Sequence, residues 1–114
     1  MRESVVERYL VKRVKEYGGV AEKHVSPGRR GVPDRDVMWP YKAIYGVAFG
    51  QAELHWVETK APNGALSDAQ KRDHARRRKM GFKVFVLWSK PLVDWYIREC
   101  LRSGKCDRTP SLHR

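Results

Sequence analysis

Apolar residues near the start of the chain recur at the spacing of one helix face. Within residues 4–17, the positions i, i+4, i+8 and i+11 are Val6, Leu10, Val14 and Tyr17. Charged residues fill the positions between them. The spacing predicts an amphipathic helix over residues 4–17, which the following Gly18-Gly19 pair should end.

Short apolar or mixed segments separated by turn residues follow this helix. The pattern predicts strands over residues 19–25 and 34–39, a turn at 26–30, and two further strands, 43–49 and 54–60, paired across Gly50-Gln51. Residues 61–67 form a loop that contains the turn dipeptide Asn63-Gly64.

The second half of the chain has clearer boundary signals. Ser67 and Gln70 have the spacing of a capping box at the start of a helix over residues 68–80, which Gly81 should end. Residues 83–88 (KVFVLW) have the composition of a buried strand. Pro91 is expected to open a last helix over residues 92–103 that ends at Gly104.

The element order is therefore α-β-β-β-(β)-α-β-α, which favours an α/β domain with a mixed sheet flanked by helices. We expect one domain over residues 1–104 and a polar tail over residues 105–114. Two cysteines, Cys100 and Cys106, provide neither a disulfide framework nor a four-ligand zinc site, and we expect reduced thiols.

The charge balance narrows the partner class. The 114 residues include 24 Lys+Arg and 13 Asp+Glu, a net charge of +11, which favours nucleic acid. An anionic membrane is an alternative partner, but binding to it needs a helix with a basic face beside a broad apolar one. The remaining interpretation is that the positive charge only keeps the protein soluble, because its molecules repel one another. No apolar run approaches the ~18 residues of a membrane span, and the charged N-terminus is unlike a signal peptide, so we expect a cytoplasmic protein.

Candidate chemistry lies where predicted strands begin or end. Asp34 (GVPDRDV) precedes one strand, and Glu58 and Lys60 (HWVETKAP) end another, with the i, i+2 spacing that places both on one face. Two carboxylates can bind a hard divalent cation, and a lysine beside them can stabilise anionic charge. Either motif alone is usually a surface ion pair or a turn, so the prediction rests on the combination.

Three segments together resemble the virus-type replication-repair nuclease (VRR-NUC) family of the PD-(D/E)xK nucleases. They are GRRGVPDRDVMW, HWVETKAPNGALSDAQKRDH and MGFKVFVLW, and the resemblance extends from about Glu3 to Trp88. The stretch WPYKAIYGVAFGQAELH is longer than a plain hairpin and departs from the expected pattern. The resemblance implies a restriction-endonuclease-like fold and a nuclease that depends on Mg²⁺ or Mn²⁺ and acts on branched DNA.

The resemblance also implies roles for particular residues. Asp34 and Glu58 would be metal ligands, the backbone carbonyl of Thr59 a further ligand, and Lys60 the catalytic lysine. Gln70 matches the glutamine of the family motif, although a capping box explains a glutamine there equally well.

The fold family also uses a glutamate on the first helix. Glu3 and Glu7 stand one turn apart on one face of the predicted helix, and both are candidates. Glu7 is the preferred candidate because the resemblance to junction resolvases implies a glutamate at this distance, eleven residues before the Gly18-Gly19 stop.

Basic residues around these motifs are the expected DNA contacts. They are Arg29, Arg30, Arg35, Lys71, Arg72, Arg76 and Lys79. Arg30 and Arg35 are expected to grip the scissile strand. Trp39, Tyr41 and Tyr45 could line an interface or stack on bases, whereas the histidines His24 and His74 are left out of the site.

The leading hypothesis is a homodimeric endonuclease that resembles Holliday junction resolvases of viral (phage) type and needs no nucleotide cofactor. It would act in the cytoplasm, which is that of the host cell if a phage encodes it. A two-fold dimer fits the two symmetric nicks that a four-way junction needs. The alternatives are a monomeric nuclease for flaps or nicks and a non-catalytic basic DNA-binding module on the same fold.

Overall fold

The computed structural model describes residues 2–24, 28, 31–40 and 52–100 of the chain. The helices are α1 (Glu3–Glu16), α2 (Asp68–Lys79), α3 (Lys90–Trp95) and η2 (Tyr96–Cys100), and the strands are β1 (Val20–Lys23), β2 (Arg35–Trp39), β3 (Glu53–Thr59) and β4 (Lys83–Leu87). None of the helices in these described segments is long and apolar enough to cross a bilayer. The expected α/β class is confirmed.

The strands form one mixed sheet in the order β1-β2-β3-β4. β1 and β2 pair antiparallel, as do β2 and β3, whereas β3 and β4 run parallel. The sequence predicted a pairing of 54–60 with 43–49. Instead, β3 hydrogen-bonds to β2 on one edge and to β4 on the other, and residues 43–49 lie outside the described part of the chain.

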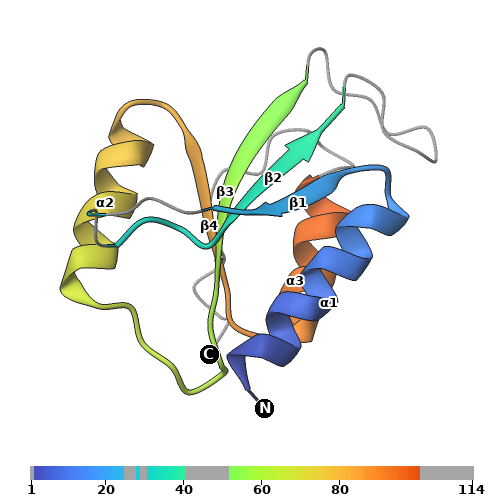
Figure 1. Ribbon diagram of the computed structural model, residues 1–114, viewed down its shortest axis with the longest axis horizontal. Coiled ribbons are helices and arrows are strands. Elements are labelled where there is room, and N and C mark those ends of the chain that lie inside the picture. Colours follow the sequence, from blue (N-terminus) through green and yellow to red (C-terminus); the bar gives the residue numbers. More distant parts are fainter. Residues whose placement is uncertain (1, 25–27, 29–30, 41–51, 101–114) are drawn as a thin grey trace.

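Helices α1 and α3 lie on one face of the sheet, and α2 lies on the other (Figure 1). The predicted apolar stripe of α1 is confirmed, because Val6, Leu10 and Val14 are completely buried. They pack with inward-facing sheet residues and with the C-terminal helices in one core, whose sheet members include Val37, Trp39, Val57, Phe85 and Leu87. This packing fixes α1 against the sheet and so places its first turn.

The predicted capping box of α2 is present in full. The Gln70 backbone N–H donates to Ser67 Oγ at 3.1 Å, and the Ser67 N–H donates to Gln70 Oε1 at 2.8 Å. Two orphan donors of the helix terminus are thereby satisfied, which stabilises the first turn next to the candidate site.

The last helical segment begins earlier than the sequence indicated. Ser89 caps α3 by accepting a hydrogen bond from the Leu92 N–H, so the helix starts at Lys90 and includes Pro91 in its first turn. It continues as the π-helical turn η2. The remainder of the predicted helix and the tail at 105–114 lie outside the described residues.

Trp39 belongs to the core, which corrects its expected place at an interface or on DNA bases. It is 1% exposed, and its indole N–H donates to Tyr96 Oη at 3.0 Å. The same hydroxyl lies 2.6 Å from Nδ1 of the buried His55. The alternation of β2 turns Trp39 to the face covered by α1 and α3, and Tyr41 and Tyr45 lie outside the described residues.

Candidate active site

Three carboxylates meet where α1, β2 and β3 approach one another. Asp34 directly precedes β2, Glu58 lies near the end of β3, and Glu3 opens α1. One oxygen from each lies within 4.8 Å of the other two. Because Arg35 pairs with Val57, the antiparallel register brings the residue before Arg35 next to the residue after Val57.

Glu58 is the buried member of this acidic cluster. It is 2% exposed, and its Oε1 has no hydrogen-bond partner in the described part of the chain. Burial, with the neighbouring charge of Asp34, raises the pKa of Glu58 to about 8, although the positive charge of Lys60 opposes this shift. A divalent cation would supply the missing partner, and three carboxylates are the oxygen ligands that Mg²⁺ or Mn²⁺ prefers, so these residues fit a metal ion.

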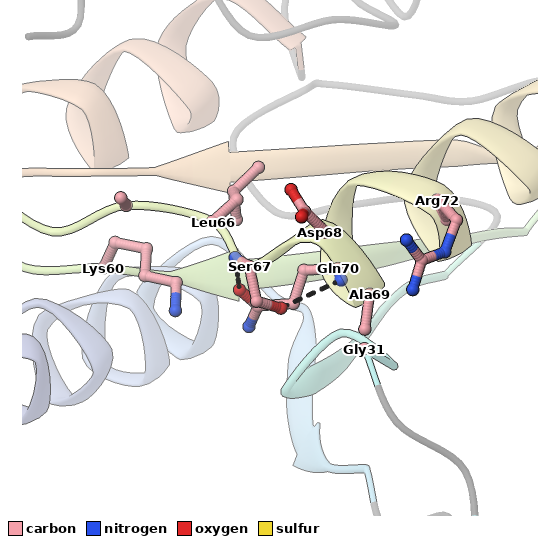
Figure 2. Close-up of a pocket in the computed structure, with 9 residues that line it drawn as sticks. Gly31, Lys60, Leu66, Ser67, Asp68, Ala69, Gln70 and Arg72 are labelled. Atoms are coloured by element: carbon pink, nitrogen blue, oxygen red, sulfur yellow. Dashed lines mark hydrogen bonds between the residues drawn. The ribbon is translucent and has the colours of Figure 1, made fainter.

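Lys60 lies beside the acidic cluster. Its Nζ is 3.9 Å from Glu58 Oε2, and its side chain is largely buried. Lys60 also lines an open pocket of about 760 Å³, together with the first turn of α2. Figure 2 shows Lys60 and the capping pair Ser67–Gln70 at this pocket, with Arg72 further along the helix. Lys60 and Gln70 thus line the same pocket, and the side-chain carbonyl oxygen of Gln70 accepts the capping hydrogen bond.

Gly31 brings the segment before Asp34 against α2. Its φ is +82°, and a Cβ added there would lie 2.4 Å from the carbonyl oxygen of Ala69. Only glycine allows both this backbone conformation and this close approach. The sequence predicts a turn at 26–30 but not this contact, because no residue in the segment GRRGVPD indicates that α2 packs against it.

The structure places Glu3, and not the preferred Glu7, beside Asp34 and Glu58. The Glu7 carboxylate is directed to Arg35, whose Nε donates to it at 3.0 Å, and to Lys23 Nζ at 3.4 Å. Arg35 also donates to the carbonyl of Ala21 at 3.3 Å. Glu3, one turn earlier, is the α1 glutamate that joins the acidic cluster. The guanidinium expected to grip DNA is therefore engaged within the protein.

The basic residues that the sequence predicts to contact DNA differ in their surroundings. Lys71, Arg72 and Lys79 are exposed, and none of the three forms an ion pair within the described residues. Arg76 is tied to Asp73 at 3.0 Å, while half of its side chain stays exposed. Arg29 and Arg30, two other expected DNA contacts, lie outside the described residues.

The buried side of α2 is structural. Asp73 holds Arg77 at 2.6 Å, and the Arg77 guanidinium lies 4.4 Å from the centre of the Trp56 ring. His74 is 1% exposed, and neither of its ring nitrogens has a hydrogen-bond partner among the described residues. The other histidine that was considered, His24, lies 3.0 Å from the Asp36 carboxylate.

Comparison with known proteins gives two similarities that cover most of the chain. No model of a known protein family matches it. The chain is 42% identical over 92 residues to "Putative nuclease p44" of Acyrthosiphon pisum secondary endosymbiont phage 1. The aligned region covers 81% of this chain and 88% of that protein. A solved structure described as a VRR_NUC domain is 34% identical, with a TM-score of 0.68 over 85% of this chain and 95% of that one.

Proposed function

We propose that this chain, which belongs to the VRR-NUC family of nucleases, is a metal-dependent endonuclease that hydrolyses phosphodiester bonds in branched DNA. One observation carries the proposal: Glu3, Asp34 and Glu58 offer oxygens within 4.8 Å of one another, beside Lys60. The restriction-endonuclease-like fold itself suggests divalent-metal use.

Each residue of this arrangement has a proposed task. Asp34, Glu58 and Glu3 would hold Mg²⁺, or Mn²⁺ in its place, with the Thr59 backbone carbonyl as a further ligand. When bound, such an ion lowers the pKa of a coordinated water and neutralises negative charge on a phosphate. Lys60 would orient the attacking water and stabilise the extra charge of the transition state. Gln70, held by its cap at the pocket, would position the substrate strand through its amide group.

DNA contact is assigned to the exposed cations nearest this pocket. Arg72 lines the pocket, and Lys71 is adjacent to it in sequence on the exposed side of α2. Arg76 and Lys79 extend the positive surface along the helix. Arg29 and Arg30, which precede Asp34 in the sequence by five and four residues, are proposed as further DNA contacts. A net charge of +11 supports phosphate binding that does not depend on sequence.

The proposed substrate is a four-way junction, cut by a homodimer. Two symmetric nicks need two sites related by a two-fold axis, and a subunit of 114 residues supplies one acidic cluster within its described part. The phage protein to which the chain is similar supports a place of action in the host cytoplasm.

Cleavage of labelled four-way, flap and nicked duplex DNA tests this proposal. The four-way substrate should be cut in Mg²⁺ or Mn²⁺ and left intact in chelator, by a species with twice the subunit mass. Glu58→Ala and Lys60→Ala should abolish cutting while retaining DNA binding, and Glu22→Gln, a change of an exposed acid on β1, should cut normally. Preferred cutting of flaps by a monomer would instead support a repair nuclease. Binding without cutting under every metal condition would indicate a non-catalytic DNA-binding module.

A further inference from the structure

The first turn of α1 carries Glu3 but has little local support. Arg2, its N-cap residue, makes no side-chain capping hydrogen bond. An uncapped first turn frays readily, because its backbone N–H groups have no partners within the helix. Glu3 itself is exposed, so burial does not hold it beside Asp34 and Glu58.

Glu7 lies one helical turn after Glu3 and is held strongly. Its carboxylate accepts a hydrogen bond from Arg35 Nε at 3.0 Å, with both side chains 19% exposed. Lys23 of β1 adds a longer contact at 3.4 Å. The Arg35 side chain is fixed in turn by its bond to the carbonyl of Ala21. Partial burial makes such a pair stronger than a solvated surface ion pair.

The Glu7–Arg35 pair joins the two segments that must meet in the acidic cluster. Arg35 is the residue directly after Asp34, and Glu7 is four residues, about 6 Å of helix rise, after Glu3. Fixing Glu7 to Arg35 therefore sets the position of Glu3 relative to Asp34. From this geometry we infer that Glu7 and Arg35 are positioning residues, which hold the first turn of α1 so that Glu3 can complete the metal site. This inference rests on the proposed function.

A second tether on the same helix provides a matched control. Toward the other end of α1, Arg13 lies 3.3 Å from Asp94, and Tyr9 donates to the same carboxylate at 2.7 Å. That tether joins α1 to α3, away from the acidic cluster. Loss of either tether should loosen α1, but only loss of the Glu7–Arg35 pair should disturb the metal ligands.

The test measures Mn²⁺ binding to the full chain by calorimetry, beside thermal unfolding and the Mn²⁺ dependence of cleavage. Glu7→Gln and Arg35→Gln should each weaken Mn²⁺ binding by about 10-fold, the size of effect usual for residues that orient metal ligands. The Mn²⁺ concentration that gives half-maximal cleavage should rise by the same factor. At saturating Mn²⁺, kcat should return to the value of the unmodified chain. The double variant, with both substitutions, should bind Mn²⁺ about as tightly as whichever single variant has the lower Mn²⁺ affinity, because the pair acts as a unit. Arg13→Gln should lower the Tm without changing Mn²⁺ affinity.

Three results would overturn the inference. Unchanged Mn²⁺ affinity in Glu7→Gln would remove its basis. An equal loss in Arg13→Gln would mean a general loosening of α1. Cleavage that stays absent in Glu7→Gln at saturating Mn²⁺ would make Glu7 a ligand itself.

Two further variants separate failure of the inference from failure of the proposed function. If Glu3→Gln and Asp34→Asn weaken Mn²⁺ binding but Glu7→Gln does not, the inference alone is wrong. If the unmodified chain binds no Mn²⁺, both are wrong. DNA binding in chelator should be unchanged in Glu7→Gln, which distinguishes a metal effect from a lost DNA contact.

Discussion

Thr59 holds the Asp34 carboxylate with two donors. Its backbone N–H and its hydroxyl both lie 3.3 Å from Asp34 Oδ2. Thr59 is completely buried at the end of β3, so the carboxylate is oriented by a rigid strand and not by a loop. Asp34 is thereby aimed at the same location as its neighbour Glu58 before any ion or substrate arrives.

Removal of the hydroxyl should therefore affect the chemistry more than the fold. Thr59→Val keeps the shape of the side chain and the backbone donor, but deletes one hydrogen bond to Asp34, worth about 1 kcal/mol. We expect a loss of about 10-fold in Mn²⁺ affinity, measured by titration, with a Tm change of only a few degrees. Thr59→Ser, which retains the hydroxyl, should bind Mn²⁺ with the same affinity as the unmodified chain. Equal Mn²⁺ affinities in the two variants would contradict this role of Thr59.

Gly31 and Gly28 form a matched pair for testing the contact between the Asp34 segment and α2. Both have positive φ, +82° and +78°, but an added Cβ would overlap Ala69 at Gly31, whereas at Gly28 it would meet none of the described residues within 4 Å. Gly28→Ala should cost about 1 kcal/mol through backbone strain alone. Gly31→Ala should cost roughly 2 kcal/mol more, because the overlap is with backbone atoms. Urea unfolding measures the difference, and similar losses in the two variants would show that the contact is unimportant.

Local signals explain which features could be predicted from the sequence. The capping box at Ser67 and Gln70 acts over three residues, and the stripe of α1 follows one helical period, so the sequence predicts both, except that Tyr17 lies just beyond the helix and is only partly buried. Motif spacing and family resemblance identify Asp34, Glu58 and Lys60 without knowledge of the fold. Their convergence depends on the register of β2 against β3.

Features set by long-range contacts were not predictable in the same way. Glu3 and Glu7 stand one turn apart on the same helix, and only long-range contacts distinguish their positions: Glu7 contacts Arg35 of β2, whereas Glu3 lies beside Asp34 and Glu58. The burial of Trp39 depends on helices from both ends of the chain. Its aromatic character alone is compatible with a core, an interface or a base-stacking position.

Glu58 should lower the stability of the metal-free protein. Its carboxylate is buried beside Asp34, and one of its oxygens lacks a partner in the described part of the chain. Because its pKa is about 8, Glu58 must take up a proton on folding at neutral pH, which costs free energy. Glu58→Gln is neutral in both states, so it should raise the free energy of unfolding at pH 7 by on the order of 2 kcal/mol while abolishing cleavage. Thermal unfolding in chelator measures this gain. Excess Mn²⁺ should stabilise the unmodified chain more than the variant. A lower Tm for the variant in chelator would contradict the prediction.

His74 should make stability depend on pH below neutrality. Burial, and then the positive charge of Arg78, lowers the pKa of His74 from 6.5 to about 4. Between these values the unfolded chain binds more protons than the folded one, so this contribution to stability falls as the pH is lowered from 6.5 toward 4. The full effect is on the order of 3 kcal/mol. His74→Leu removes both the titration and the unpaired nitrogens, and should flatten the loss of Tm between pH 7 and 5. An unchanged pH profile in this variant would show that other groups dominate.

The exposed cations beside the pocket should contribute to DNA affinity through counterion release. Lys71→Gln and Arg72→Gln should each weaken binding of four-way DNA and lower the slope of log K against log salt by about 1, as expected for one lost phosphate contact. Lys15→Gln is the matched control, because Lys15 is also an exposed cation but lies near the end of α1 remote from Glu3. Its salt slope should equal that of the unmodified chain. Fluorescence anisotropy in chelator measures all four proteins without cleavage, and equal slopes throughout would place the DNA on another face.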